Sequence, residues 1–174
     1  MAVKTVLRMG HPVLRKIADP VTEFNTPALD GLIEDMFDTM LAMDGAGLAA
    51  PQIGISKRLV IFSVGTNPRY PDAEAVPETV LINPQIELVG EAMQDDWEGC
   101  LSIPGMRGLV PRYAEIIYRG QDRNGQDFER RVSGFHARVV QHEVDHLDGI
   151  LYPQRIRDMQ RFGFVEELTG MNIE

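Results

Sequence analysis

Residues 133–149 read SGFHARVVQHEVDHLDG, and this stretch has the pattern of an amphipathic helix. Its apolar residues recur at helical spacing and form one stripe. The members of this stripe are Phe135, Val139, Val140, Val144 and Leu147. Gly149 follows the last of them, where a glycine commonly ends a helix. We therefore predict a buried helix that ends near Gly149.

The same helix carries the pattern His142-Glu143-Val144-Asp145-His146. Residues four apart share one face of a helix, so both imidazoles can reach a single metal ion. Glu143 lies beside the first imidazole, where a carboxylate can act as general base on a water at that ion. The alternative is a surface helix with two unrelated histidines. A buried helix disfavours it, because buried histidines without a metal need other partners.

Two histidines leave a catalytic metal one protein ligand short, since such sites have three protein ligands and one open position. The candidates are Cys100, His136 and Glu166. His136 lies six residues before His142 and faces another direction on the helix. A lone cysteine is more often an inert buried residue, but the two-histidine pattern favours Cys100 as the ligand. A thiolate beside two imidazoles suits zinc, ferrous iron, cobalt or nickel.

The rest of the chain predicts an α+β fold, because a helix is followed by strands and then by helices. Thr26 and Pro27 are typical of a helix start, and helical periodicity runs from there to Leu41. Strands are expected over 58–64, 79–89, 114–119 and 126–132, the last two joined at Asn124 and Gly125 as a hairpin. A loop is expected over 65–77 and a C-terminal helix over 156–168. We predict mixed or antiparallel strands packed around a central metal-binding helix, with an N-terminal and a C-terminal helix, in one catalytic metallohydrolase domain over 1–174.

Composition narrows the class of protein. The formal net charge of −9 argues against affinity based on phosphate neutralisation, so no sequence-specific nucleic-acid recognition is expected. Seven arginines between positions 107 and 138 are interpreted as mostly solvated. The single cysteine cannot form an internal disulfide. No signal peptide or membrane span is present in the sequence, which favours a soluble cytoplasmic protein with no membrane partner.

Three motifs resemble those of the peptide deformylase family. Residues 45–52 read GAGLAAPQ, residues 98–102 read EGCLS, and residues 141–149 read QHEVDHLDG. The similarity runs from about residue 8 to residue 152. It implies a metal-dependent enzyme that hydrolyses the N-formyl group of formyl-methionyl nascent peptides and releases formate.

The resemblance also implies roles for individual residues. The implied metal ligands are Cys100, His142 and His146, and the implied general acid and base is Glu143. The Gln52 amide and the backbone N–H of Leu101 are implied to bind the carbonyl oxygen. The implied substrate-binding residues are Gly47, Gly99, Phe135, Arg138, Val139 and His142. A metal-bound water is then the expected nucleophile, since a bound metal lowers the pKa of its water.

The resemblance implies one divalent ion per chain, with ferrous iron as the usual working metal and zinc, nickel or cobalt as alternatives. Arg138 departs from the family pattern, because many members have an aliphatic pocket residue there. Some bacterial members dock on the ribosome through a basic C-terminal helix. Here Glu166, Glu167 and Glu174 would repel RNA, so at most a transient ribosome contact is expected.

Other functions remain open from the residues alone. A zinc endopeptidase could use the two histidines with Glu166, 20 residues after His146, as third ligand. That alternative leaves Cys100 and Gln52 without roles. A non-catalytic protein that binds metal or formyl peptides would not need the base Glu143. A cysteine nucleophile is ranked below both, because its histidine partner would be taken from the metal site.

Overall fold

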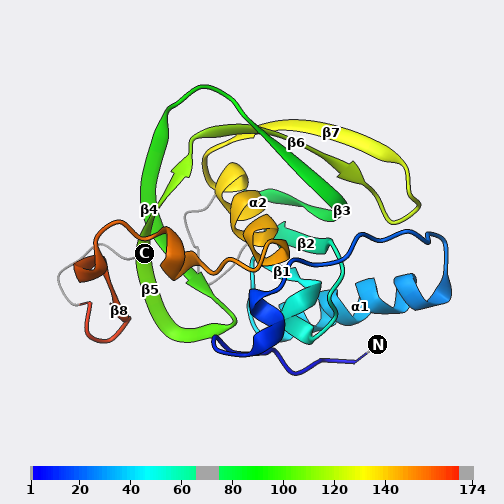
Figure 1. Ribbon diagram of the computed structural model, residues 1–174, viewed down its shortest axis with the longest axis horizontal. Coiled ribbons are helices and arrows are strands. Elements are labelled where there is room, and N and C mark those ends of the chain that lie inside the picture. Colours follow the sequence, from blue (N-terminus) through cyan, green and yellow to red (C-terminus); the bar gives the residue numbers. More distant parts are fainter. Residues whose placement is uncertain (1, 66–74, 169–174) are drawn as a thin grey trace.

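The computed structural model describes residues 2–65 and 75–168, and its arrangement is shown in Figure 1. The described elements, with η for a 3-10 helix, are η1 (Pro12–Arg15), α1 (Pro27–Ala42), β1 (Gly47–Ala49), η2 (Ala50–Ile53), β2 (Leu59–Val64), β3 (Val76–Leu88), β4 (Met93–Cys100), β5 (Ile103–Tyr113), β6 (Glu115–Gln121), β7 (Asp127–Ser133), α2 (Gly134–Leu147), η3 (Tyr152–Arg155), η4 (Met159–Arg161) and β8 (Phe162–Phe164). The α+β class predicted from the sequence is confirmed.

The larger sheet has the strand order β1-β2-β3-β6-β7, with antiparallel neighbours throughout. Strand β2 shows why this sheet is covered on both faces. Its residues are almost all buried, and successive side chains point to opposite faces. Val60 and Phe62 pack in one apolar cluster with α2, whereas Leu59 and Ile61 pack in another with α1. The sheet is therefore sandwiched between the two helices.

Helix α1 begins where the sequence predicts. The Thr26 side chain accepts a hydrogen bond from the backbone N–H of Leu29, and Pro27 occupies the first turn. Ile33, Met36 and Met40 are fully buried against the sheet. Burial of this apolar face, more than the intrinsic propensity of the residues, stabilises the helix.

The smaller sheet has the order β4-β5-β8, again antiparallel. In Figure 1 it lies on the other side of α2 from the larger sheet, so α2 is the central element. Strands β4 and β5 are joined by a tight turn at Leu101 and Ser102, with Cys100 paired to Ile103. This turn brings the residues of the EGCLS motif next to α2.

The larger sheet has one local irregularity and one turn that the sequence predicts. The pairing of β3 with β6 shifts register between Ile82 and Gln85, where Asn83 adopts a left-handed conformation and its side chain binds both backbone groups of Val21. The β6–β7 hairpin turns at Asn124 and Gly125. The loop expected over 65–77 lies mostly outside the described residues, and Val76 already belongs to β3.

The C-terminal helix expected over 156–168 is wrong for the described residues. The chain forms the short η4 and then β8, whose residues pair with Met106 to Gly108 at the edge of β5. Gly163 lies in the middle of this segment, and glycine is unfavourable inside a helix. Pairing with an open strand edge therefore prevails over a weak helical pattern. Among the described residues, no helix has the length and apolar character needed to cross a membrane.

Candidate metal centre and substrate cavity

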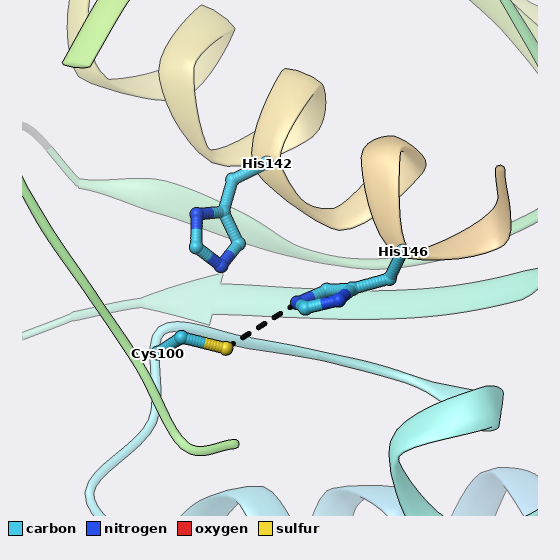
Figure 2. A group of neighbouring side chains, drawn as sticks. All are labelled: Cys100, His142 and His146. Carbon is cyan, nitrogen blue, oxygen red and sulfur yellow. Dashed lines mark hydrogen bonds between the residues drawn. The ribbon is translucent and has the colours of Figure 1, made fainter. Parts of the chain in front are cut away.

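Three side chains that can bind a metal converge between α2 and the end of β4 (Figure 2). His142 and His146 lie one turn apart on α2, and Cys100 is the last residue of β4. Their ligand atoms lie within 4.8 Å of one another, and Cys100 Sγ is 3.4 Å from His146 Nε2. All three residues are buried. The structure thus brings together the three residues predicted as ligands.

The chemistry of these donors fits a divalent metal ion. One thiol and two imidazoles are the ligand types of catalytic sites for zinc and related metals. His142 Nδ1 is held by Glu98 at 2.8 Å, which leaves Nε2 as the free ligand atom. Burial and the neighbouring His142 lower the pKa of His146, so its ring is neutral, the form that binds metal. Burial alone would lower the pKa of His142, but hydrogen bonds to Cys100 and Glu98 raise it well above its usual value.

A buried carboxylate behind His142 is saturated with hydrogen bonds. Glu98 Oε1 accepts from Arg112 Nε at 2.8 Å and from Arg138 Nη1 at 2.9 Å. Its Oε2 accepts from Arg112 Nη2 at 3.0 Å and from His142 Nδ1. A carboxylate offers about four acceptor positions, and all are used here. Burial would raise the pKa of Glu98, but Arg112 and the hydrogen bonds hold it well below its usual range. An ionised carboxylate can only accept, so His142 must donate its Nδ1 proton.

Asp145, inside the HEVDH motif, extends this set of charges. Arg112 Nη1 donates to Asp145 Oδ2 at 2.6 Å, and Arg155 Nη2 donates to Asp145 Oδ1 at 2.8 Å. Arg112 therefore bridges a carboxylate of β4 and a carboxylate of α2. Most of the seven arginines between positions 107 and 138 are at least partly exposed, as expected, but Arg112 and Arg138 are buried.

Glu143 lies beside the three candidate metal ligands and against the backbone of β1. Burial raises its pKa to about 7, and its Oε2 is buried without a hydrogen-bond partner among the described residues. A Cβ added at Gly47 would lie only 2.4 Å from Glu143 Oε1. Glycine at position 47 thus makes the room in which the carboxylate sits. A base with a pKa near 7 is well matched to proton transfer at neutral pH.

The amide of Gln52 is fixed by its neighbours. Its Oε1 accepts from the backbone N–H of Ala49 at 2.8 Å, which turns Nε2 toward the metal centre. Nε2 lies 3.1 Å from Ser102 Oγ and 3.4 Å from Cys100 Sγ. Sequence reasoning assigned no role to Ser102, although it is fully buried and orients this amide.

One cavity contains nearly all of the residues predicted from the sequence. The predicted residues that line it are Gly47, Gln52, Gly99, Cys100, Leu101, Phe135, Arg138, Val139, His142 and Glu143. His146 joins the site through its contact with Cys100. Sequence reasoning missed Trp97 and Glu98 in the cavity wall. Glu98 lies two residues before Cys100 on one strand, a spacing that places both side chains on the same face and could have pointed to it.

Comparison with known proteins agrees with this geometry. The family model described as polypeptide deformylase matches residues 3–162. The chain belongs to this family. Peptide deformylase 1 of Nitrosomonas europaea is 60% identical over 166 residues, covering 95% of this chain and 94% of that protein. Peptide deformylase 2 of Ralstonia nicotianae is also 60% identical, with the same coverage.

A solved structure shows the same fold. The class I type b peptide deformylase of Acinetobacter baumannii, described as bound to Met-Ala-Ser, superposes with a TM-score of 0.86 and 43% identity. The match covers 89% of this chain and 99% of that one. The activity of this chain is therefore that of a peptide deformylase, a metal-dependent hydrolase.

The competing third ligands lie elsewhere in this deformylase. His136 Nε2 contacts the Tyr118 hydroxyl at 3.3 Å, and its ring packs against Phe62 and Tyr118. Glu166 is exposed beyond β8. Among the described residues, the grouping of possible metal ligands consists of Cys100, His142 and His146. The ligand set of the endopeptidase alternative is therefore not assembled.

Proposed function

We propose that this deformylase hydrolyses the N-formyl group of formyl-methionyl peptides at a metal held by Cys100, His142 and His146. The observation that carries the proposal is that these three ligand atoms lie within 4.8 Å of one another. Cys100, His142 and Glu143 line the same cavity. The relative from Acinetobacter baumannii is described as bound to Met-Ala-Ser, a peptide that begins with methionine.

We propose one divalent ion per chain, ferrous iron in the cell, with zinc, nickel or cobalt able to occupy the same ligands. Such an ion supplies a Lewis acid for the formyl carbonyl and a water acidic enough to react near neutral pH. The mixed sulfur and nitrogen donor set supports this choice of metals.

Glu143 is the proposed general base and acid. Its carboxylate takes a proton from the attacking water as a C–O bond forms at the formyl carbon. It then delivers that proton to the leaving nitrogen as the C–N bond breaks, which yields formate and a free amine. Its buried position and its pKa near 7 support both halves of this transfer.

The developing negative charge on the formyl oxygen needs hydrogen-bond donors. We assign this role to Gln52 Nε2, which faces the centre, and to the backbone N–H of Leu101 in the β4–β5 turn. One donor of this kind is typically worth about 3 kcal/mol of transition-state stabilisation.

The methionine side chain is proposed to lie in the cavity beside Phe135 and Val139, with His142 and Arg138 in its wall. Gly47 and Gly99 border the same cavity and leave their backbones accessible to an extended peptide. The substrate would then lie between β1 and β4.

We further propose that residues 1–174 act as a single catalytic domain in the cytoplasm, where nascent chains are made. Any ribosome contact is proposed to be transient. Glu166 and Glu167 are exposed and would repel RNA, while Glu174 lies outside the described residues.

The proposal is tested by comparing Glu143→Gln with Cys100→Ala, measuring metal content and formate release from a formyl-Met peptide. Glu143→Gln should keep the metal and lose at least about 100-fold in turnover, the usual range for general acid–base catalysis. Cys100→Ala should lose the metal. Near-native formate release by Glu143→Gln would refute the assigned base. Metal-loaded wild-type protein that binds the peptide without releasing formate would refute catalysis itself.

A further inference from the structure

Arg138 lies in the cavity wall, yet its guanidinium is directed into the protein. The residue is only 6% exposed. Its Nη1 donates to Glu98 Oε1 at 2.9 Å and to the Val110 carbonyl at 2.8 Å, and its Nη2 donates to the Gln94 carbonyl at 2.6 Å. Both protons of Nη1 and one proton of Nη2 are thus used within the protein.

These acceptors belong to two paired strands of the smaller sheet, β4 and β5. Gln94 and Glu98 lie on β4, Val110 lies on β5, and Arg138 lies on α2. A guanidinium has its donors in a rigid planar fork, so three simultaneous hydrogen bonds fix direction as well as distance. Arg138 therefore ties α2 to the β4–β5 pair at a defined separation.

This tie lies next to the proposed ligands on both elements. Arg138 precedes His142 by one helical turn, and the two side chains share the carboxylate of Glu98, one at each oxygen. Glu98 in turn precedes Cys100 by two residues on β4. Glu98 therefore links the strand that carries the sulfur to the helix that carries the nitrogens.

We propose that Arg138 is a positioning residue for the metal centre. It holds β4 at the spacing from α2 at which Cys100 meets His142 and His146. It also orients Glu98 to accept the hydrogen bond from the Nδ1–H of His142. The proposal rests on the ligand set given under Proposed function. It assigns Arg138 to the metal centre and not to the choice of substrate side chain.

Partners that orient metal ligands typically contribute about 10- to 100-fold in metal affinity or activity. Arg138 acts one step behind Glu98, so Arg138→Met should weaken metal binding by about tenfold. The same variant should lower kcat, because the ligands are displaced, and should leave KM for a formyl-Met peptide within about twofold. Arg138→Lys should recover part of the affinity, since one ammonium can reach Glu98 but cannot span both strands.

The experiment measures the affinity of each purified protein for Zn²⁺ by competition with a chelator, and the absorption spectrum of its Co²⁺ form. Arg131→Met is the matched control, because Arg131 is exposed and pairs only with Glu115 among the described residues. Cys100→Ser tests the ligand set separately: unchanged zinc affinity there would refute the ligand set and, with it, the positioning role of Arg138, whereas a change confined to the Arg138 variants bears on Arg138 alone. Arg138→Gln, which keeps one NH₂ group as a donor, is included in case Arg138→Met does not fold.

The proposal is supported if the Arg138 variants bind zinc more weakly and have an altered cobalt spectrum. Arg138→Lys should recover part of the zinc affinity, and Arg131→Met should show no change. The proposal is overturned if every folded Arg138 variant binds zinc with parental affinity and shows the parental cobalt spectrum. It is overturned by that result even if the thermal stability of the variants falls or their KM values change, because those effects would mark a structural or a specificity residue.

Discussion

Replacing Gly47 by alanine should displace Glu143, the proposed general base, without altering any of the proposed metal ligands. The new Cβ would lie 2.4 Å from Glu143 Oε1, 2.6 Å from Cδ and 2.8 Å from Cγ. The carboxylate oxygen would have to move by about 1 Å to reach the 3.4 Å at which ordinary contact begins. A misplacement of about 1 Å can cost about 100-fold in rate, or about 2.7 kcal/mol of transition-state stabilisation.

The assay is steady-state formate release from a formyl-Met peptide by Gly47→Ala, together with its metal content. We expect kcat/KM to fall by about 100-fold while metal content stays at one ion per chain. Gly31→Ala is the control: a Cβ there meets nothing within 4 Å, and the change should leave activity intact while favouring α1 by about 1 kcal/mol.

A double-mutant cycle identifies the cause of the loss. If Gly47→Ala acts by displacing Glu143, it should cost far less in a Glu143→Ala background than in the parent, because the displaced group is already absent. Equal losses in both backgrounds would refute this reasoning. So would a Gly47→Ala enzyme that keeps kcat/KM within about twofold of the parent.

Three further results are expected. Ser102→Ala removes the acceptor that orients the Gln52 amide, so kcat/KM should fall by about fivefold with metal content unchanged, since a net hydrogen bond is worth about 1 kcal/mol. Glu98→Leu leaves two buried guanidiniums without their carboxylate, so denaturant unfolding should show a loss of about 3–5 kcal/mol, against a much smaller loss for the exposed Glu115→Leu. A strong chelator should abolish formate release until Zn²⁺ or Fe²⁺ is restored, and a hydroxamate should inhibit by competing with the peptide; activity that survives metal removal would refute the metal centre.

The elements that could be predicted are those with a strong local pattern. Helix α2 has an apolar stripe at helical spacing, and Val139, Val140, Val144 and Leu147 of that stripe are buried in the structure. The β6–β7 hairpin was predicted because an asparagine and a glycine favour the tight turn between two strand patterns. Such signals lie within a few residues of one another, so one sequence is enough to detect them.

The C-terminal helix was predicted wrongly because its outcome depends on a distant partner. Apolar residues at helical spacing follow Ile156, but the edge of β5, some 50 positions earlier in the chain, offers unpaired backbone groups. Pairing there satisfies Phe162 to Phe164 as a strand. No pattern within the segment itself reveals that this edge is open.

The site, too, has residues that a local sequence pattern predicts and residues that only the packed structure reveals. Two of the proposed ligands and the proposed base lie in one helical motif, and the presence of these residues favours Cys100 as the third ligand. The supporting arginines could not be predicted, because Arg112 and Arg155 join Glu98 and Asp145 only after the strands and the helix have packed. An isolated arginine in a strand gives no sign that it will be buried.

The placement of these charges explains why a motif with so few residues suffices for a metal site. Arg138, His142 and Asp145 are spaced by four and three residues and so share one face of α2. That face meets β4 and β5, where Glu98 and Arg112 complement it with opposite charges. A buried ion pair adds little net stability once desolvation is counted, but its geometry is demanding. We therefore infer that the network contributes mainly to the position of α2 and less to stability. Its ion pairs can form in one placement of the helix against the strands, and in that placement the imidazoles face the thiol.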